Sequence, residues 1–199
     1  METSEHVEEG LLEHLQEEIS NLNNVGLDLF YMGKLMTSVF HFNQALLLIK
    51  RLSKVKKLAR KTKDEEQLTI AFPSDSKCDL LKLGQLIPID SETLASVPRW
   101  ELIVTLALIH NSAVVYYEAK SFENAEQMLR LAIRLLKYDL TVEALNHLMS
   151  TSMYAATIFV SMYTMLGKTK NQIAPGTKET KKALKVADGL KERFMKNRV

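Results

Sequence analysis

Histidine and cysteine are the side chains that most often bind metals or act as nucleophiles, and this 199-residue chain has five of the first and one of the second. None of the histidines has another histidine or a cysteine at the spacing of a zinc site. Cys78 lies between Lys77 and Asp79, and the sequence assigns no histidine as its base. We therefore expect no metal, no cofactor and no enzymatic activity, and keep an enzyme using Cys78 only as a contrasting hypothesis. The histidines are His6, His14, His41, His110 and His147.

Motifs for nucleotide binding and acyl transfer are also missing. Gly26 and Gly33 do not precede a Lys-Ser or Lys-Thr pair, which a phosphate-binding loop requires. The chain has no Gly-x-Ser-x-Gly sequence, which presents the nucleophile of many hydrolases. The sequence therefore favours a binding role over a catalytic one.

Basic side chains give the strongest rival signal. Every charged residue in the range 50–63 is Lys or Arg, and residues 178–198 are again basic. Such a face could contact nucleic acid, anionic lipid or the acidic N-terminal helix of the chain itself. The run lacks aromatic residues for base stacking, and Leu52 and Ala59 continue an apolar stripe. We interpret it as the solvated flank of a long helix, and keep RNA or DNA binding through both ranges as the alternative. The exposed basic positions expected here are Lys54, Lys57, Arg60 and Lys61.

Composition indicates a protein of the cell interior. The net charge is +2, and 46% of the residues are hydrophobic. The first 33 residues carry eight acidic side chains and no Lys or Arg, unlike a secretory signal. A single cysteine allows no internal disulfide, and no window approaches the apolar length of a membrane span. We expect an intracellular protein, in the cytoplasm rather than the nucleus.

Helical periodicity defines the expected elements. Apolar residues recur every three or four positions up to about Tyr31, and again over 36–60. Further helices are expected from Arg99 onward, over 122–137 and 142–166, and after Thr177. The expected organisation is a hairpin at 1–63, an irregular insertion at 64–98, a second hairpin with an apolar helix at 99–167, a linker at 168–176 and a basic helix at 177–199.

Two segments of the chain, 22–50 and 109–137, match each other at an offset of 87 residues. Many positions pair like with like, and small residues recur where two antiparallel helices would cross most closely. One such hairpin cannot bury its apolar flank alone, so neighbours must stack on it. The small residues are Gly26, Ser38 and Ala45 in the first segment and Ala113, Ala125 and Ala132 in the second.

This pattern resembles the tetratricopeptide repeat. In that family a small residue and an aromatic one mark the first helix, glycine marks the turn, and a small residue, an aromatic residue and an alanine mark the second helix. Gly33 and Phe42 also match in the first segment, whereas Leu29 replaces the usual aromatic residue. In the second, Tyr116 and Phe122 match, and Lys120 replaces the turn glycine. The resemblance implies an all-α fold of stacked antiparallel hairpins, an α-solenoid, with an irregular insertion between its two recognisable repeats.

The resemblance also implies an adaptor or scaffold that binds a peptide or helix of another protein on a concave face. Asn24 and Asn111 occupy equivalent places on the first helices, where such an asparagine faces the groove in some subfamilies and binds peptide backbone. Leu27, Tyr31 and Tyr117 are the candidate neighbours. The alternative is that both asparagines bond within the array. A homodimer is left open.

Overall fold

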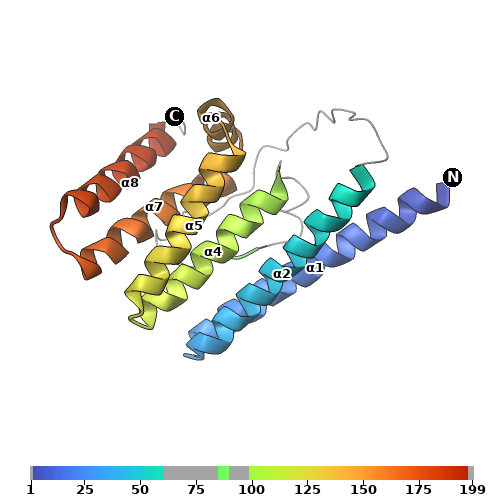
Figure 1. Ribbon diagram of the computed structural model, residues 1–199, viewed down its shortest axis with the longest axis horizontal. Coiled ribbons are helices and arrows are strands. Elements are labelled where there is room, and N and C mark those ends of the chain that lie inside the picture. Colours follow the sequence, from blue (N-terminus) through green and yellow to red (C-terminus); the bar gives the residue numbers. More distant parts are fainter. Residues whose placement is uncertain (1, 61–84, 90–98, 197–199) are drawn as a thin grey trace.

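The computed structural model describes residues 2–60, 85–89 and 99–196, and this part of the chain is helical without strands (Figure 1). Cys78 and Lys61 lie outside the described residues, as do the side chains of Lys54, Lys57 and Arg60. Because the described elements are all helices, the expected all-α class is confirmed. No helix of the described residues is long and apolar enough to cross a membrane. The helices are α1 (Glu2–Tyr31), α2 (Leu35–Arg60), α4 (Trp100–Glu118), α5 (Phe122–Asp139), α6 (Val142–Thr151), α7 (Met153–Ile173) and α8 (Lys178–Lys196).

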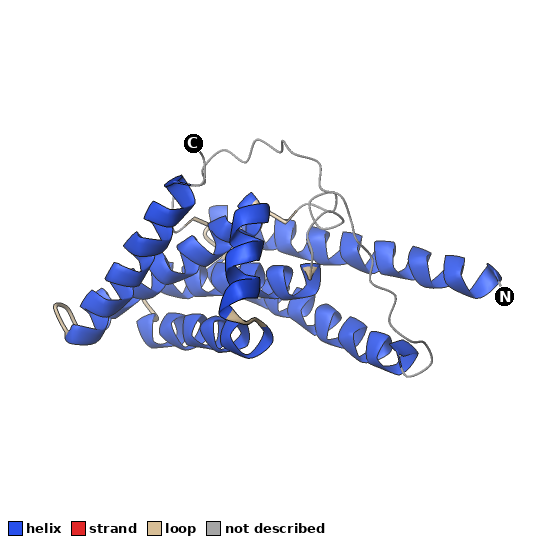
Figure 2. Ribbon diagram, turned by 90° about the horizontal axis from the view of Figure 1, so that it is seen from above, coloured by secondary structure: helices blue, strands red, loops and turns tan. Residues whose placement is uncertain are grey.

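Successive helices pack side by side. Helix α1 packs on α2, α2 on α4, α4 on α5 and α7, and α7 on α5, α6 and α8. The described helices accordingly run from α1 and α2 at one end of the molecule to α8 at the other (Figure 1). Short loops join consecutive helices within residues 2–60 and within residues 99–196 (Figure 2). Helix α4 has neighbours on several sides, and its residues from Leu106 to Val115 are all buried. The core of the protein is therefore centred on α4 and α7.

Small residues bring α1 and α2 close together, as the repeat predicted. A Cβ atom on Gly26 would lie 2.4 Å from Cε1 of Phe42, whose ring is completely buried. The hydroxyl of Ser38 donates a hydrogen bond of 2.6 Å to the carbonyl of Gly26 across the same contact. Ala45, and the counterparts in α4 and α5, are also fully buried. The six small residues therefore lie at helix contacts and not in solvent.

The close approach at Gly26 gives a test of this packing. Replacing Gly26 with alanine should lower the free energy of unfolding by about 1–3 kcal/mol, because the buried Phe42 ring has no room to move aside. The matched control is Gly189→Ala in α8, where a new Cβ would meet nothing within 4 Å. Alanine is the better helix former, so the control should gain about 0.5–1 kcal/mol. Urea denaturation followed by circular dichroism measures both values, and equal stabilities would contradict the predicted clash.

The turns that follow α1 and α4 have the same backbone hydrogen bonds. The N–H groups of Gly33 and Lys34 donate to carbonyls three and five residues earlier, at 2.8 Å. Those of Lys120 and Ser121 do the same at 2.9 Å. This pair of hydrogen bonds closes many helix C-termini and needs a left-handed residue, and φ is +75° at Gly33 and +58° at Lys120. Lysine at the second turn therefore adopts the conformation that glycine adopts at the first.

Two sequence expectations about the second half of the chain were wrong. The apolar stretch 142–166 is not one helix, because Ser152 is extended and separates α6 from α7. Its hydroxyl accepts a hydrogen bond from the N–H of Ala155 at 3.2 Å, which caps α7. The expected linker at 168–176 is mostly helical, since α7 continues to Ile173. Thr169, on this last part of α7, is fully buried, so this part of the helix packs against the rest of the protein.

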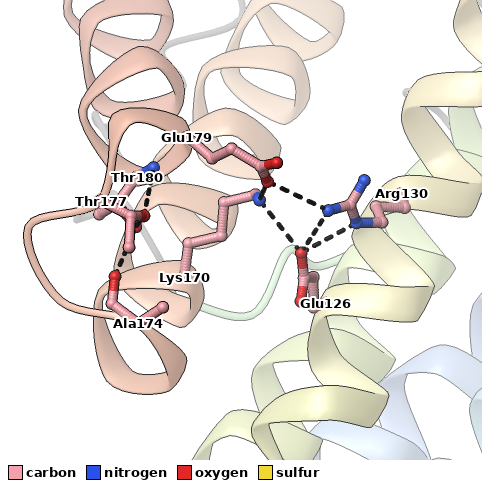
Figure 3. A network of polar contacts seen from close by, with 7 residues as sticks. All are labelled: Glu126, Arg130, Lys170, Ala174, Thr177, Glu179 and Thr180. Carbon is pink, nitrogen blue, oxygen red and sulfur yellow. Dashed lines mark hydrogen bonds and ion pairs between the residues drawn. The ribbon is translucent and has the colours of Figure 1, made fainter.

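Charged side chains connect α5, α7 and α8 (Figure 3). The ammonium group of Lys170 lies 3.2 Å from a carboxylate oxygen of Glu126 and 2.6 Å from one of Glu179. Arg130 lies 2.8 Å from the same oxygen of Glu126. The hydrogen bond from Lys170, together with the charges of Lys170 and Arg130, lowers the pKa of Glu179. The last hairpin is thus joined to α5 by ion pairs as well as by apolar contacts.

Candidate functional site

An extended stretch of the chain, residues 85–89, is enclosed by the helices, and we call it the inner segment. Leu86, Ile87 and Ile89 are 3%, 1% and 1% exposed, whereas Gln85 and Pro88 face solvent. Figure 1 shows the segment in light green beside α4. Proline fixes its own φ and disfavours a helical conformation of the residue before it, which explains why the segment is extended. Its buried backbone groups must therefore find partners outside a helix or sheet.

Asn111 of α4 supplies two of these partners. Its side-chain oxygen accepts a hydrogen bond of 2.7 Å from the N–H of Ile87, and its nitrogen donates one of 2.8 Å to the carbonyl of the same residue. A neighbouring strand in an antiparallel sheet pairs with a residue through the same two groups. The side chain of Asn111 thus makes the two hydrogen bonds that a neighbouring strand would make, and this side chain is completely buried.

Asn23 of α1 completes the pairing. Its oxygen accepts a hydrogen bond of 2.9 Å from the second N–H of the Asn111 amide. Its nitrogen donates to the carbonyl of Ile87 at 3.3 Å. Both asparagines are fully buried, and a buried amide is tolerated only when its donors and acceptors are paired. The two side chains therefore form one unit that binds the backbone of Ile87.

Hydroxyl groups from two helices bind the next two carbonyls. Ser20 of α1 donates a hydrogen bond of 2.6 Å to the carbonyl of Ile89. Tyr154 of α7 donates one of 2.9 Å to the carbonyl of Pro88. Consecutive residues of the inner segment are thus bound by α1, α4 and α7, always through the backbone of the segment. We refer to Ser20, Asn23, Asn111 and Tyr154 as the backbone-binding residues.

A neutral histidine lies beside this site. His110 is fully buried, its Nδ1 is 3.4 Å from the side-chain oxygen of Asn111, and its Nε2 has no hydrogen-bond partner among the described residues. Burial lowers its pKa from 6.5 to about 4, and the contact with Asn111 opposes this only in part. The ring is therefore uncharged at neutral pH. The hydrogen bonds to the inner segment come from uncharged amides and hydroxyls, an arrangement suited to binding a peptide group.

The five residues expected to bind a partner lie in different environments. Asn111 is buried and binds Ile87, whereas Asn24 is exposed on α1. Leu27 is half-buried against the core, and Tyr31 is 70% exposed at the end of α1. Tyr117 is half-buried, with its ring edge-on to that of Phe122. The hydrogen bonds to the inner segment involve Asn111 alone among the five.

Sequence reasoning missed three of the four backbone-binding residues. The match between the two segments pairs Asn24 with Asn111, and it therefore predicts that Asn24 is as buried as Asn111. The buried asparagine of α1 is instead Asn23, the residue before it. Helix α1 has substantial contact with only one other described helix, which leaves Asn24 in solvent. Ser20 and Tyr154 gave no signal of their own, since a serine or tyrosine in an apolar helix is common. The sequence placed residues 85–89 only within the irregular insertion expected at 64–98.

Neither the described residues nor comparisons with known proteins indicate a metal site or a further binding site. Among the residues that the structure describes, no group of three His, Cys, Asp or Glu side chains is placed to hold a metal ion. A scan against protein-family models and searches of curated proteins and of solved structures found no match to the chain. The backbone-binding residues are therefore the observation on which a functional hypothesis can rest.

Proposed function

We propose that this chain is a non-enzymatic protein-binding adaptor built from tetratricopeptide-like hairpins, which holds an extended peptide of a partner protein against α1, α4 and α7. The observation that carries the proposal is the pairing of Asn111 with both the N–H and the carbonyl of Ile87. Any peptide offers these two groups. A side chain placed to bind them makes little demand on the sequence of its ligand.

The arrangement of the helices supports the repeat character. Each hairpin contacts the next, and the first two hairpins end their first helices with the same pair of backbone hydrogen bonds. Repeats stacked in this way contribute their first helices to one shared surface. Here α1, α4 and α7 are those first helices, and they carry the backbone-binding residues.

Recognition of an extended peptide by its backbone is an established mode of protein binding. Main-chain hydrogen bonds fix the peptide, and pockets for its side chains give specificity. In this site the buried side chains of Leu86, Ile87 and Ile89 indicate which kind of side chain such pockets accept. The hypothesis therefore concerns a partner with an apolar, extended segment.

Affinity capture with the full-length protein tests this function. We expect partners recovered by the wild type to be retained by Asn24→Ala, which changes an exposed amide, and to be lost with Asn111→Ala. Asn111→Ala also destabilises the fold, so a second control is needed. Leu129→Ala removes a fully buried side chain of α5, at a cost of about 2–5 kcal/mol, without changing a backbone-binding residue.

The comparison with Leu129→Ala decides the result. Partners lost with Asn111→Ala but retained with Leu129→Ala at the same temperature would support a role of the amide in binding. Equal recovery with the wild type and Asn111→Ala would refute the proposal, as would equal loss in both destabilised variants.

A further inference from the structure

We infer that the inner segment is an intramolecular ligand occupying the partner site, and that the partner supplies an extended peptide of the same chemistry, with uncharged apolar side chains at the positions that Leu86, Ile87 and Ile89 occupy here. This inference rests on the proposed function. It adds what the partner peptide looks like and what it must displace.

The polar contacts of the inner segment are those of a bound peptide. The hydrogen bonds that Ser20, Asn23, Asn111 and Tyr154 make with the segment all involve main-chain atoms of residues 87–89. None of them uses a side chain of the segment. Another peptide in the same conformation could therefore accept and donate the same bonds.

Burial along the segment defines the side chains that fit. Leu86, Ile87 and Ile89 are almost completely buried, and Pro88 between them is exposed. The position of Pro88 therefore contributes its carbonyl, which Tyr154 binds. Proline has no backbone N–H, so the segment donates no main-chain hydrogen bond at this position. A charged side chain at the position of Leu86, Ile87 or Ile89 would lose its hydration without an opposite charge among the backbone-binding residues.

An attached ligand competes with a free one through its high effective concentration. The affinity measured for a free peptide is the intrinsic affinity reduced by the fraction of molecules whose site is empty. Truncating a buried side chain of the inner segment raises that fraction, and it leaves the sequence of every helix and all four backbone-binding residues unchanged. The affinity for a free peptide should then rise, a result that a purely structural segment does not predict.

The test uses a fluorescent peptide with the sequence of residues 84–91, Gly-Gln-Leu-Ile-Pro-Ile-Asp-Ser, titrated into the full-length protein. We expect the double variant Ile87→Ala, Ile89→Ala to bind it at least about tenfold more tightly than the wild type, since buried truncations of this kind weaken packing by more than that factor. A control peptide with aspartate in place of both isoleucines should bind neither protein. Adding Asn111→Ala to the double variant should abolish the gain.

A second measurement covers the case in which the double variant is unstable. A ligand that binds the folded state raises the melting temperature, so the peptide should raise the Tm of the double variant more than that of the wild type. Equal binding to both proteins would overturn the inference while leaving the proposed function intact, because the wild-type site would then be open to peptides. Absence of binding and of any Tm rise in both would also overturn it, and the capture experiment would still decide the proposed function.

Discussion

Replacing Asn111 with alanine should lower the free energy of unfolding by about 2–5 kcal/mol. The change leaves the N–H of Ile87 and the side-chain oxygen of Asn23 without their partners, and it removes one of the two bonds to the carbonyl of Ile87. Each buried polar group that loses its partner costs about 1–3 kcal/mol. The effect is large because the amide and its partners are fully buried and water cannot replace the lost bonds.

Urea denaturation measures this loss. Asn24→Ala is the matched control: this exposed side chain only accepts a long hydrogen bond of 3.5 Å from the nitrogen of Asn23, so its loss should stay within about 0.5 kcal/mol of the wild type. Hydrogen exchange at the amide of Ile87 should accelerate in Asn111→Ala only. A loss below about 1 kcal/mol for Asn111→Ala would mean that the inner segment is not held by this residue.

Lowering the pH from 7 to 4 should destabilise the protein by about 3 kcal/mol through His110 alone. The folded-state pKa of this group is about 4, and its ordinary value is 6.5. Between these values the unfolded chain binds a proton that the folded protein does not, so stability falls as the pH falls. The effect is absent above pH 6.5 and complete below pH 4, and each tenfold difference in proton affinity between the two states corresponds to about 1.36 kcal/mol.

Two variants isolate His110 from the carboxylates that also titrate in this range. His110→Leu and His110→Phe should each show a shallower loss of stability between pH 7 and pH 4 than the wild type, by up to about 3 kcal/mol. In the wild type, the NMR signal of the His110 ring should not titrate above pH 5. Parallel pH profiles for wild type and variants would show that burial does not hold this ring neutral.

Much of the fold follows from periodicity in the sequence. Helices α1, α2 and α5 end within about two residues of where the periodicity predicted, because apolar residues recur every three or four positions along each of them. The division between α6 and α7 could not be predicted, because the stretch is apolar on most sides and Ser152 could equally have been an interior residue. Its role as a cap depends on the extended backbone there.

The site could be predicted only in part, since it combines distant parts of the chain. Asn111 was singled out from its place in the repeat, but its ligand comes from a segment 24 residues earlier and its second partner from 88 residues away. Local patterns carry no signal for such pairings. The sequence predicted an irregular insertion at 64–98, and nothing in it showed that residues 86–89 are enclosed by helices or which helices enclose them.

The shared bonds of the turns after α1 and α4 bear on how such repeats are detected. Glycine fills the left-handed position in one turn and lysine in the other, yet both close the helix with the same carbonyls. Lysine there costs on the order of 1 kcal/mol, which a stacked array can absorb. A profile that scores residue identity at this column would penalise the second unit, whereas backbone torsion angles would score the two alike. These two turns are therefore alike in backbone geometry although their residues differ.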